Sequence, residues 1–285
     1  MKRIDLCGDW AGKCIFPDKR DFEFGGAVPG SAIFDLINAE RLPRDIFWRD
    51  NADAVAEFES CDYVYKKKFD FEGESRGALL RFERIDTYAD VYLNGKKVYH
   101  SENGNIRHDI DVGDALLQGE NLVEVHLYSP SVWVKDMPLR YGAFTRERMN
   151  TRRMQCTYGW DWVDRFVTMG IYRDVRLVFR KPNEIANVYV FTKRITPLSA
   201  QIKAEIEFRD VISEEASAEM KIYAPDGKLI FSKVRKILKE TMDESFDIPS
   251  PELWYPNGYG EQPLYKLVIS TPSSVKETVF GIREI

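Results

Sequence analysis

The chain has 285 residues, which is long for one β-sandwich domain and comfortable for two. Hydrophobic residues make up 44% of the chain, which is enough to pack a core and argues against global disorder. The net charge is −5, with 41 basic and 46 acidic residues mixed along the chain, so neither nucleic acid nor a membrane is an expected partner, because both call for a basic face. Binding of a neutral carbohydrate does not require a particular net charge, so the charge does not exclude carbohydrates as ligands.

The cysteines and the N-terminus exclude further classes. The four cysteines form no C-x-x-C pair and lie far from the three histidines: Cys7, Cys14, Cys61 and Cys156. We therefore predict four reduced, mostly buried thiols, no metal site and no cofactor. No apolar stretch precedes Asp5, and no apolar run approaches the length of a membrane span. These features predict a cytoplasmic protein without a signal peptide.

The first half of the chain alternates with a period of two, which is typical of half-buried strands. One short helix is predicted at 31–38, with Ser31 as its N-cap. Strands are predicted at 63–71 and 87–93, and the second ends at Asn94-Gly95. That dipeptide favours a type I′ hairpin turn, because both central residues need φ > 0. Three further strands follow, at 97–99, 122–128 and 171–179.

The pattern restarts after Lys181-Pro182-Asn183. The alternation is cleanest at 200–208, and Ala224-Pro225-Asp226-Gly227 is a turn in which Pro presets φ and Gly accepts a positive φ. Later strands are predicted at 230–234, 264–270 and 275–280. About seven strands in about 100 residues are typical of an immunoglobulin-like sandwich. The predicted fold is therefore all-β, with a jelly-roll β-sandwich at 1–181 followed by an immunoglobulin-like β-sandwich at 182–285.

One long segment, 129–158, shows no strand pattern. It is rich in arginines and aromatic residues: Arg140, Arg146, Arg148, Arg152 and Arg153, with Trp133, Tyr141 and Phe144 between them. Loops of this length in compact domains are usually functional or disordered. A functional loop and a solvated basic loop that packs on another domain are both compatible with this composition.

Several segments together resemble glycoside hydrolase family 2. The resemblance runs through the chain in a fitting order and spacing: Trp10, 27–30, 62–65 with Phe69, 84–95, 119–122 and 170–175. Within that family, two segments resemble β-mannosidases, namely 158–162 with Arg165, and 253–265. β-Mannosidases commonly have Gly-Pro after the second tryptophan, where this chain has Val163-Asp164. Exo-β-glucosaminidases and β-galactosidases of the same family are the alternatives.

The resemblance implies a retaining glycosidase, whose two catalytic carboxyl groups stand roughly 5 Å apart. In this family both are glutamates on a TIM barrel, and the chain has no βαβ series that could build one. Its last residues, 280–285, resemble the family's junction with the barrel. We therefore expect the barrel downstream, no catalytic residue in this chain, no role in catalysis for Glu284, and no hydrolysis by the chain alone.

The resemblance also implies a substrate-binding role for 159–162, which would reach across to the barrel and help close the pocket around a terminal β-mannoside. Asp161 would accept sugar hydroxyls, and Trp160 and Trp162 would stack on a pyranose. Arg152 or Arg153 would orient Asp161. The alternatives are an aspartate that caps a turn, tryptophans that belong to the core or a domain interface, and arginines that are surface charges.

Two further expectations concern partners. The chain would bind its own missing barrel, and exposed barrel-facing surface would favour self-association into a homo-oligomer. A stand-alone carbohydrate-binding module is the competing function. The aromatic segment 254–265 is interpreted as a rigid loop that orders the second domain rather than as a sugar platform.

Overall fold

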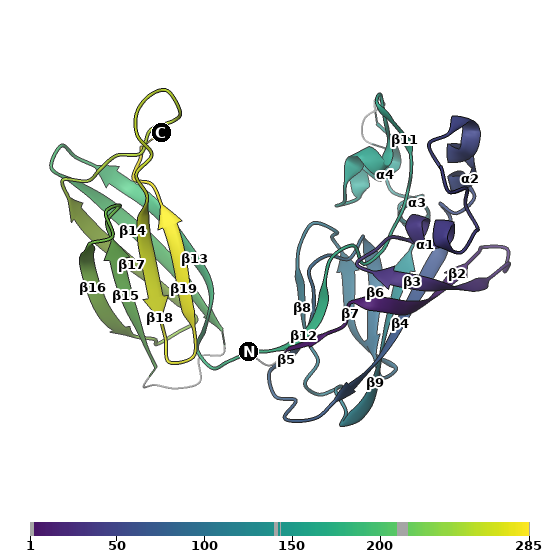
Figure 1. The fold of residues 1–285 in the computed structure, drawn as a ribbon, viewed down its shortest axis with the longest axis horizontal. Coiled ribbons are helices and arrows are strands. Elements are labelled where there is room, and N and C mark those ends of the chain that lie inside the picture. Colours follow the sequence, from purple (N-terminus) through teal and green to yellow (C-terminus); the bar gives the residue numbers. More distant parts are fainter. Residues whose placement is uncertain (1–2, 140–141, 143, 210–215, 285) are drawn as a thin grey trace. The chain divides into compact units, whose positions relative to one another are not determined.

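The computed structural model describes residues 3–139, 142, 144–209 and 216–284. It divides into two compact units, Met1–Phe179 and Arg180–Ile285 (Figure 1). The sequence placed the boundary two residues later, after Lys181. Both units are built from β-sheets with only short helices, which confirms the all-β prediction.

Unit 1 is a jelly-roll sandwich of two antiparallel sheets. The larger sheet has the order β3-β2-β4-β9-β6-β7 and the smaller has the order β1-β12-β5-β8. The strands of the larger sheet are β2 (Gly8–Ile15), β3 (Phe22–Val28), β4 (Asp62–Phe71), β6 (Tyr88–Leu93), β7 (Lys96–Glu102) and β9 (Gly119–Tyr128). Those of the smaller are β1 (Arg3–Asp5), β5 (Ala78–Phe82), β8 (His108–Asp111) and β12 (Val175–Phe179). The helical segments are α1 (Ala32–Asn38), η1 (Arg49–Ala52), α2 (Asp53–Ala56), α3 (Pro130–Trp133), α4 (Arg146–Asn150) and η2 (Gln155–Thr157).

The core of unit 1 follows from the period of two. On β6, Ala89, Val91 and Leu93 are almost fully buried between the sheets, whereas the residues between them lie on the outer face. Tyr63 and Tyr65 of β4 join the same core cluster, as the sequence predicts. Each large apolar side chain buried in this way contributes about 1.5–3 kcal/mol.

The turn and helix predicted for this unit are present. Asn94 and Gly95 both have positive φ, at 53° and 79°, which confirms the type I′ turn. The Leu122 amide donates to Asn94 Oδ1 at 2.9 Å, so the turn is also tied to β9. Helix α1 begins after Ser31, which occupies the N-cap position but makes no side-chain capping bond. Asp35 fixes the helix instead, because it accepts from the Tyr65 hydroxyl at 2.7 Å.

Unit 2 is an immunoglobulin-like sandwich. Its sheets have the orders β13-β14-β17 and β16-β15-β18-β19. The strands are β13 (Glu184–Ile195), β14 (Ser199–Arg209), β15 (Ser217–Tyr223), β16 (Leu229–Lys236), β17 (Thr241–Pro249), β18 (Tyr265–Ser270) and β19 (Val275–Phe280). The predicted alternation of β14 is confirmed, since every second residue from Ala200 to Phe208 is buried. The predicted turn is also confirmed, with the Gly227 amide donating to Ala224 O at 2.9 Å.

All four cysteines are free, but only Cys14 and Cys61 are buried, while Cys7 and Cys156 are partly exposed. Within residues 3–139, 142, 144–209 and 216–284, no three His, Cys, Asp or Glu side chains are grouped so that they could hold a metal ion. Among the same residues, no helix has the length and apolar character to cross a membrane.

Candidate functional site

The segment between β9 and β12 gathers at one end of unit 1 (Figure 1). It contains α3, α4 and η2, followed by a short hairpin of β10 (Tyr158–Trp160) and β11 (Val163–Arg165). The sequence predicted no regular structure at 129–158, so these short helices are a difference from the prediction. Arg140 and Tyr141 of this segment lie outside the described residues.

The tip of the β10–β11 hairpin carries three of the four predicted site residues, namely Trp160, Asp161 and Trp162. Trp160 pairs with Val163, so Asp161 and Trp162 form the two-residue turn. Trp160 is 49% exposed and Trp162 is 71% exposed, and Asp161 is exposed as well. Neither tryptophan packs in the core of unit 1. In the part of the chain that the structure describes, the Asp161 carboxylate has no hydrogen-bond partner, so it is available to a ligand.

The base of the hairpin is clamped by Arg165. Its Nε donates to Glu59 Oε2 at 2.9 Å, and its Nη2 contacts Glu59 Oε1 as well. The same Nη2 donates to Glu147 Oε1 at 3.0 Å, and Ser131 Oγ donates to Glu59 Oε1 at 2.6 Å. The hydrogen bonds to Glu59 raise the pKa of Arg165 despite its partial burial. Bidentate pairing of this kind restricts geometry, so the clamp joins β11 to α3, α4 and the segment before β4.

Beneath the hairpin lies a buried ion pair. The Arg153 side chain is fully buried, and its Nη2 donates to Asp86 Oδ2 at 2.9 Å and also to Thr168 O. Burial raises the pKa of Asp86, and the Arg153 charge opposes that shift. The Arg153 guanidinium also lies 5.3 Å from the centroid of the Tyr158 ring. Arg153 therefore packs against Tyr158 of the hairpin and forms its ion pair with Asp86. Among the described residues it forms no ion pair with Asp161.

The two remaining arginines of interest differ in their surroundings. Arg152 is exposed, and its carbonyl accepts from the Gly104 amide at 2.9 Å. No contact between Arg152 and Asp161 is present among the described residues, so its orienting role stays a prediction. The sequence pattern does not distinguish Arg148 from the other arginines of this segment, yet its guanidinium carbon stands 4.6 Å from the centroid of the Trp160 ring. Only its position within an arginine-rich segment hinted at this contact.

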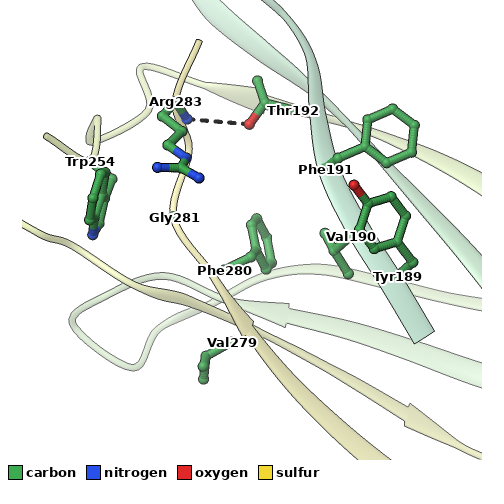
Figure 2. A pocket seen from close by; sticks show the side chains of 9 residues that line it. All are labelled: Tyr189, Val190, Phe191, Thr192, Trp254, Val279, Phe280, Gly281 and Arg283. Atoms are coloured by element: carbon green, nitrogen blue, oxygen red, sulfur yellow. Dashed lines mark hydrogen bonds between the residues drawn. The ribbon is translucent and has the colours of Figure 1, made fainter. Parts of the chain in front are cut away.

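Unit 2 has a hollow of about 510 Å³ between the edge strands β13 and β19. Figure 2 shows Trp254 and Arg283 at one end of it and Tyr189 and Phe191 at the other. A Cβ on Gly281 would stand only 2.7 Å from the Trp254 indole, so glycine lets the ring pack on the backbone there. The Arg283 guanidinium lies 5.0 Å from the same ring. Trp254 thus anchors the loop 253–264 against residues 281–283, which follow β19, while the rigidity of that loop stays a prediction.

Two successive β-sandwiches define this chain as a two-domain all-β protein, and the first carries an exposed hairpin with a carboxylate between two indoles. The chain belongs to glycoside hydrolase family 2. A family model described as "Glycosyl hydrolase 2 galactose-binding domain-like" matches residues 17–173, and one described as "Glycosyl hydrolases family 2" matches residues 183–283.

The similar proteins include several β-mannosidases. The chain is 29% identical over 309 aligned residues to β-mannosidase B of Aspergillus clavatus, covering 99% of this chain and 35% of the relative. It is 32% identical to β-mannosidase B of Aspergillus terreus over 66% of this chain. The β-D-mannosidase of Dictyoglomus thermophilum matches all of the chain with a TM-score of 0.86 and 32% identity. A Bifidobacterium dentium β-glucuronidase, at 20% identity and a TM-score of 0.62, shares the fold.

The chain spans about a third of the length of the β-mannosidases that match it from end to end. It covers 35% of the Aspergillus clavatus enzyme and 36% of the Dictyoglomus thermophilum enzyme. The chain therefore resembles the N-terminal domains of β-mannosidases, and a glucuronidase of the same fold is among its structural neighbours.

Proposed function

We propose that this chain is the non-catalytic front part of a retaining β-mannosidase, and that its hairpin completes the pocket for a terminal β-linked mannose. In this proposal Asp161 accepts sugar hydroxyls, and Trp160 and Trp162 cover the apolar face of the ring. The catalytic carboxylates come from a barrel that this chain does not contain. The observation that carries the proposal is the exposed, unpaired Asp161 carboxylate between two exposed indoles.

The clamp at the base of the hairpin supports this role. A carboxylate that recognises hydroxyls must be held in place before the sugar arrives, because ordering it on binding would cost affinity. Arg165 connects β11 to Glu59 and Glu147, and so it fixes the strand that follows the tip. The Arg148 guanidinium on Trp160 restrains one of the two indoles in the same way.

The proposal predicts that the purified 285-residue chain does not turn over an aryl β-mannoside. It also predicts that the coding sequence beyond residue 285 encodes a TIM barrel with two catalytic glutamates. Turnover by the chain itself, free of host enzyme, would exclude the missing-barrel explanation. A stop codon directly after residue 285 would equally contradict it.

The role of Asp161 can be tested in a chimera. This chain would replace the part of the Dictyoglomus thermophilum enzyme that aligns with it. The alignment covers all of this chain and 36% of that enzyme. Asp161→Asn should lower kcat/KM for an aryl β-mannoside roughly ten- to hundredfold, since a charged hydrogen bond contributes about 1.5–3 kcal/mol. Asp164→Asn is the matched control, because Asp164 is an exposed aspartate of the same hairpin. Equal effects of both changes would exclude hydroxyl recognition by Asp161. The ratio of activities on β-mannosides, β-glucosaminides and β-galactosides would decide between the related substrates.

A stand-alone carbohydrate-binding module is the second candidate, and the galactose-binding-like description of the family model at 17–173 favours it. It predicts sugar affinity at the hairpin of the isolated chain that is lost in Asp161→Ala or Trp160→Ala. The first proposal predicts little affinity at the hairpin, because half of the pocket is absent. Titration of the isolated chain, followed at the Trp160 and Trp162 indoles, separates the two.

A further inference from the structure

The outer face of the large sheet in unit 1 carries a floor of aromatic rings. Tyr88, His100 and Tyr128 come from three neighbouring strands, β6, β7 and β9. Tyr88 pairs directly with Tyr128, and Asp90 of β6 pairs with His100. Residues that alternate with these, such as Ala89, face the core. The three rings therefore project from the same outer side of the sheet.

Trp133, the last residue of α3, lies on this floor. Its ring stacks on Tyr88 with a centroid distance of 4.9 Å and an interplanar angle of 16°. The His100 and Tyr128 rings lie 5.6 and 5.4 Å away, at 29° and 32°. Trp133 is nevertheless 38% exposed. All three ring partners come from the sheet side, so none of these three rings stacks on the opposite face of the indole.

The position of Trp133 is fixed by the chain around it. The Trp133 amide donates to Ser129 O at 2.8 Å, and the Ser129 amide donates to Asp62 Oδ1 at 2.8 Å. The Ser129 hydroxyl caps α3 by accepting from the Val132 amide. A ring held in this way loses little conformational freedom when a ligand stacks on it.

Polar groups surround the floor. Asp90 holds its members together, with Oδ1 at 2.6 Å from His100 Nδ1 and Oδ2 accepting from the Tyr128 hydroxyl at 3.0 Å. The Lys97 ammonium also pairs with Asp90 Oδ1, at 2.7 Å, and keeps about half of its surface exposed. Glu102 is 65% exposed and its Oε1 lies 3.3 Å from His100 Nε2. The face thus offers a flat apolar ring with a carboxylate and an ammonium group beside it.

We propose that this face of unit 1 is a saccharide-binding surface centred on Trp133, formed by other residues than those at the tip of the β10–β11 hairpin, and that it takes a neutral pyranoside unit of an oligosaccharide. A pyranose has one apolar C–H face that stacks on an aromatic ring and hydroxyls around its edge that pair with charged groups. A protein partner fits less well, because the centres of protein interfaces are depleted in charged residues such as Lys97 and Glu102.

The test is a titration of the full 285-residue chain with β-1,4-mannotriose, followed by the indole N–H signals of the six tryptophans in NMR spectra. The Trp133 signal should shift saturably at millimolar sugar. Trp133→Ala should weaken this binding at least tenfold, and Trp48→Ala should leave it unchanged. Trp48 is the matched control, because it is 59% exposed and makes no ring contact with this floor.

A second variant distinguishes a loss of binding from a loss of folding, because Trp133→Ala could cause either. Glu102→Gln changes only an exposed carboxylate, and we expect it to weaken binding about threefold or more while the spectrum keeps its native dispersion. The proposal is overturned if no Trp133 shift occurs up to about 10 mM sugar. It is also overturned if the shifts are confined to Trp160 and Trp162 and survive in Trp133→Ala, a result that would leave the proposal for the hairpin intact.

Discussion

At the scale of single residues, Arg152 and Arg153 show how neighbours in the sequence reach opposite environments. Arg152 is exposed, whereas Arg153 is fully buried on Asp86. Removing one member of a buried pair leaves an uncompensated charge, so Arg153→Met should lower the free energy of unfolding of unit 1 by about 3–5 kcal/mol. Arg152→Met should change it by less than about 0.5 kcal/mol. Urea unfolding of both variants checks this, and equal effects would contradict it.

The ion pair between Arg153 and Asp86 should also make the effect of Arg153→Met on the stability of unit 1 depend on pH. Burial raises the pKa of the Asp86 carboxyl above its usual value of 3.8. A raised pKa in the folded state stabilises the fold below the unfolded pKa, and that contribution is lost as the pH rises through the folded value. Without Arg153 the pKa of Asp86 should rise further, because the charge that favours its ionised form is gone. At lower pH more of the unpaired carboxyl is neutral. The destabilisation by Arg153→Met should therefore be smaller near about pH 5 than near about pH 7. A loss that is independent of pH would show that the Asp86 charge does not depend on Arg153.

At the scale of elements, the β6–β7 hairpin depends on backbone angles that few residues tolerate. Gly95 has φ +79° and open space where a Cβ would be placed. Gly95→Ala should therefore destabilise unit 1 by about 1–2 kcal/mol through its backbone conformation alone. Gly25 of β3 also has open space but no positive φ, so Gly25→Ala should be neutral or slightly stabilising. Thermal unfolding of the two variants measures the difference, and identical melting temperatures would refute this explanation.

At the scale of the whole molecule, the residues that the structure describes form two hydrophobic cores that share no residue. Phe82 is fully buried in the first and Phe246 in the second. Truncation of either to alanine should cost about 3–5 kcal/mol in its own unit. Hydrogen exchange resolved by peptide should show Phe246→Ala loosening residues 180–285 while the protection of 1–179 is retained. The reciprocal pattern is expected for Phe82→Ala, and a uniform loss across both units would contradict two separate cores.

Several local features of this protein were predictable from its residues alone. The strands β4, β6 and β14 were predictable because alternating side chains fall on opposite faces of any strand, whatever its neighbours are. The turn at Asn94-Gly95 was predictable because positive φ is a property of those residue types. Membership of the family also followed from short motifs in a fixed order, and the matching family models confirm it.

Contacts between residues that are distant in the sequence became visible only in the folded chain. Arg153 and Asp86 are 67 positions apart, and Arg165 and Glu59 are 106 apart. The contact of Arg148 with Trp160 and the floor beneath Trp133 were likewise absent from any local pattern. The physical reason is that these contacts depend on the order of strands within a sheet. That β9 lies between β4 and β6 is set by the packing of the whole sandwich, because the hydrophobic alternation of each strand fixes its inner face but not its neighbours.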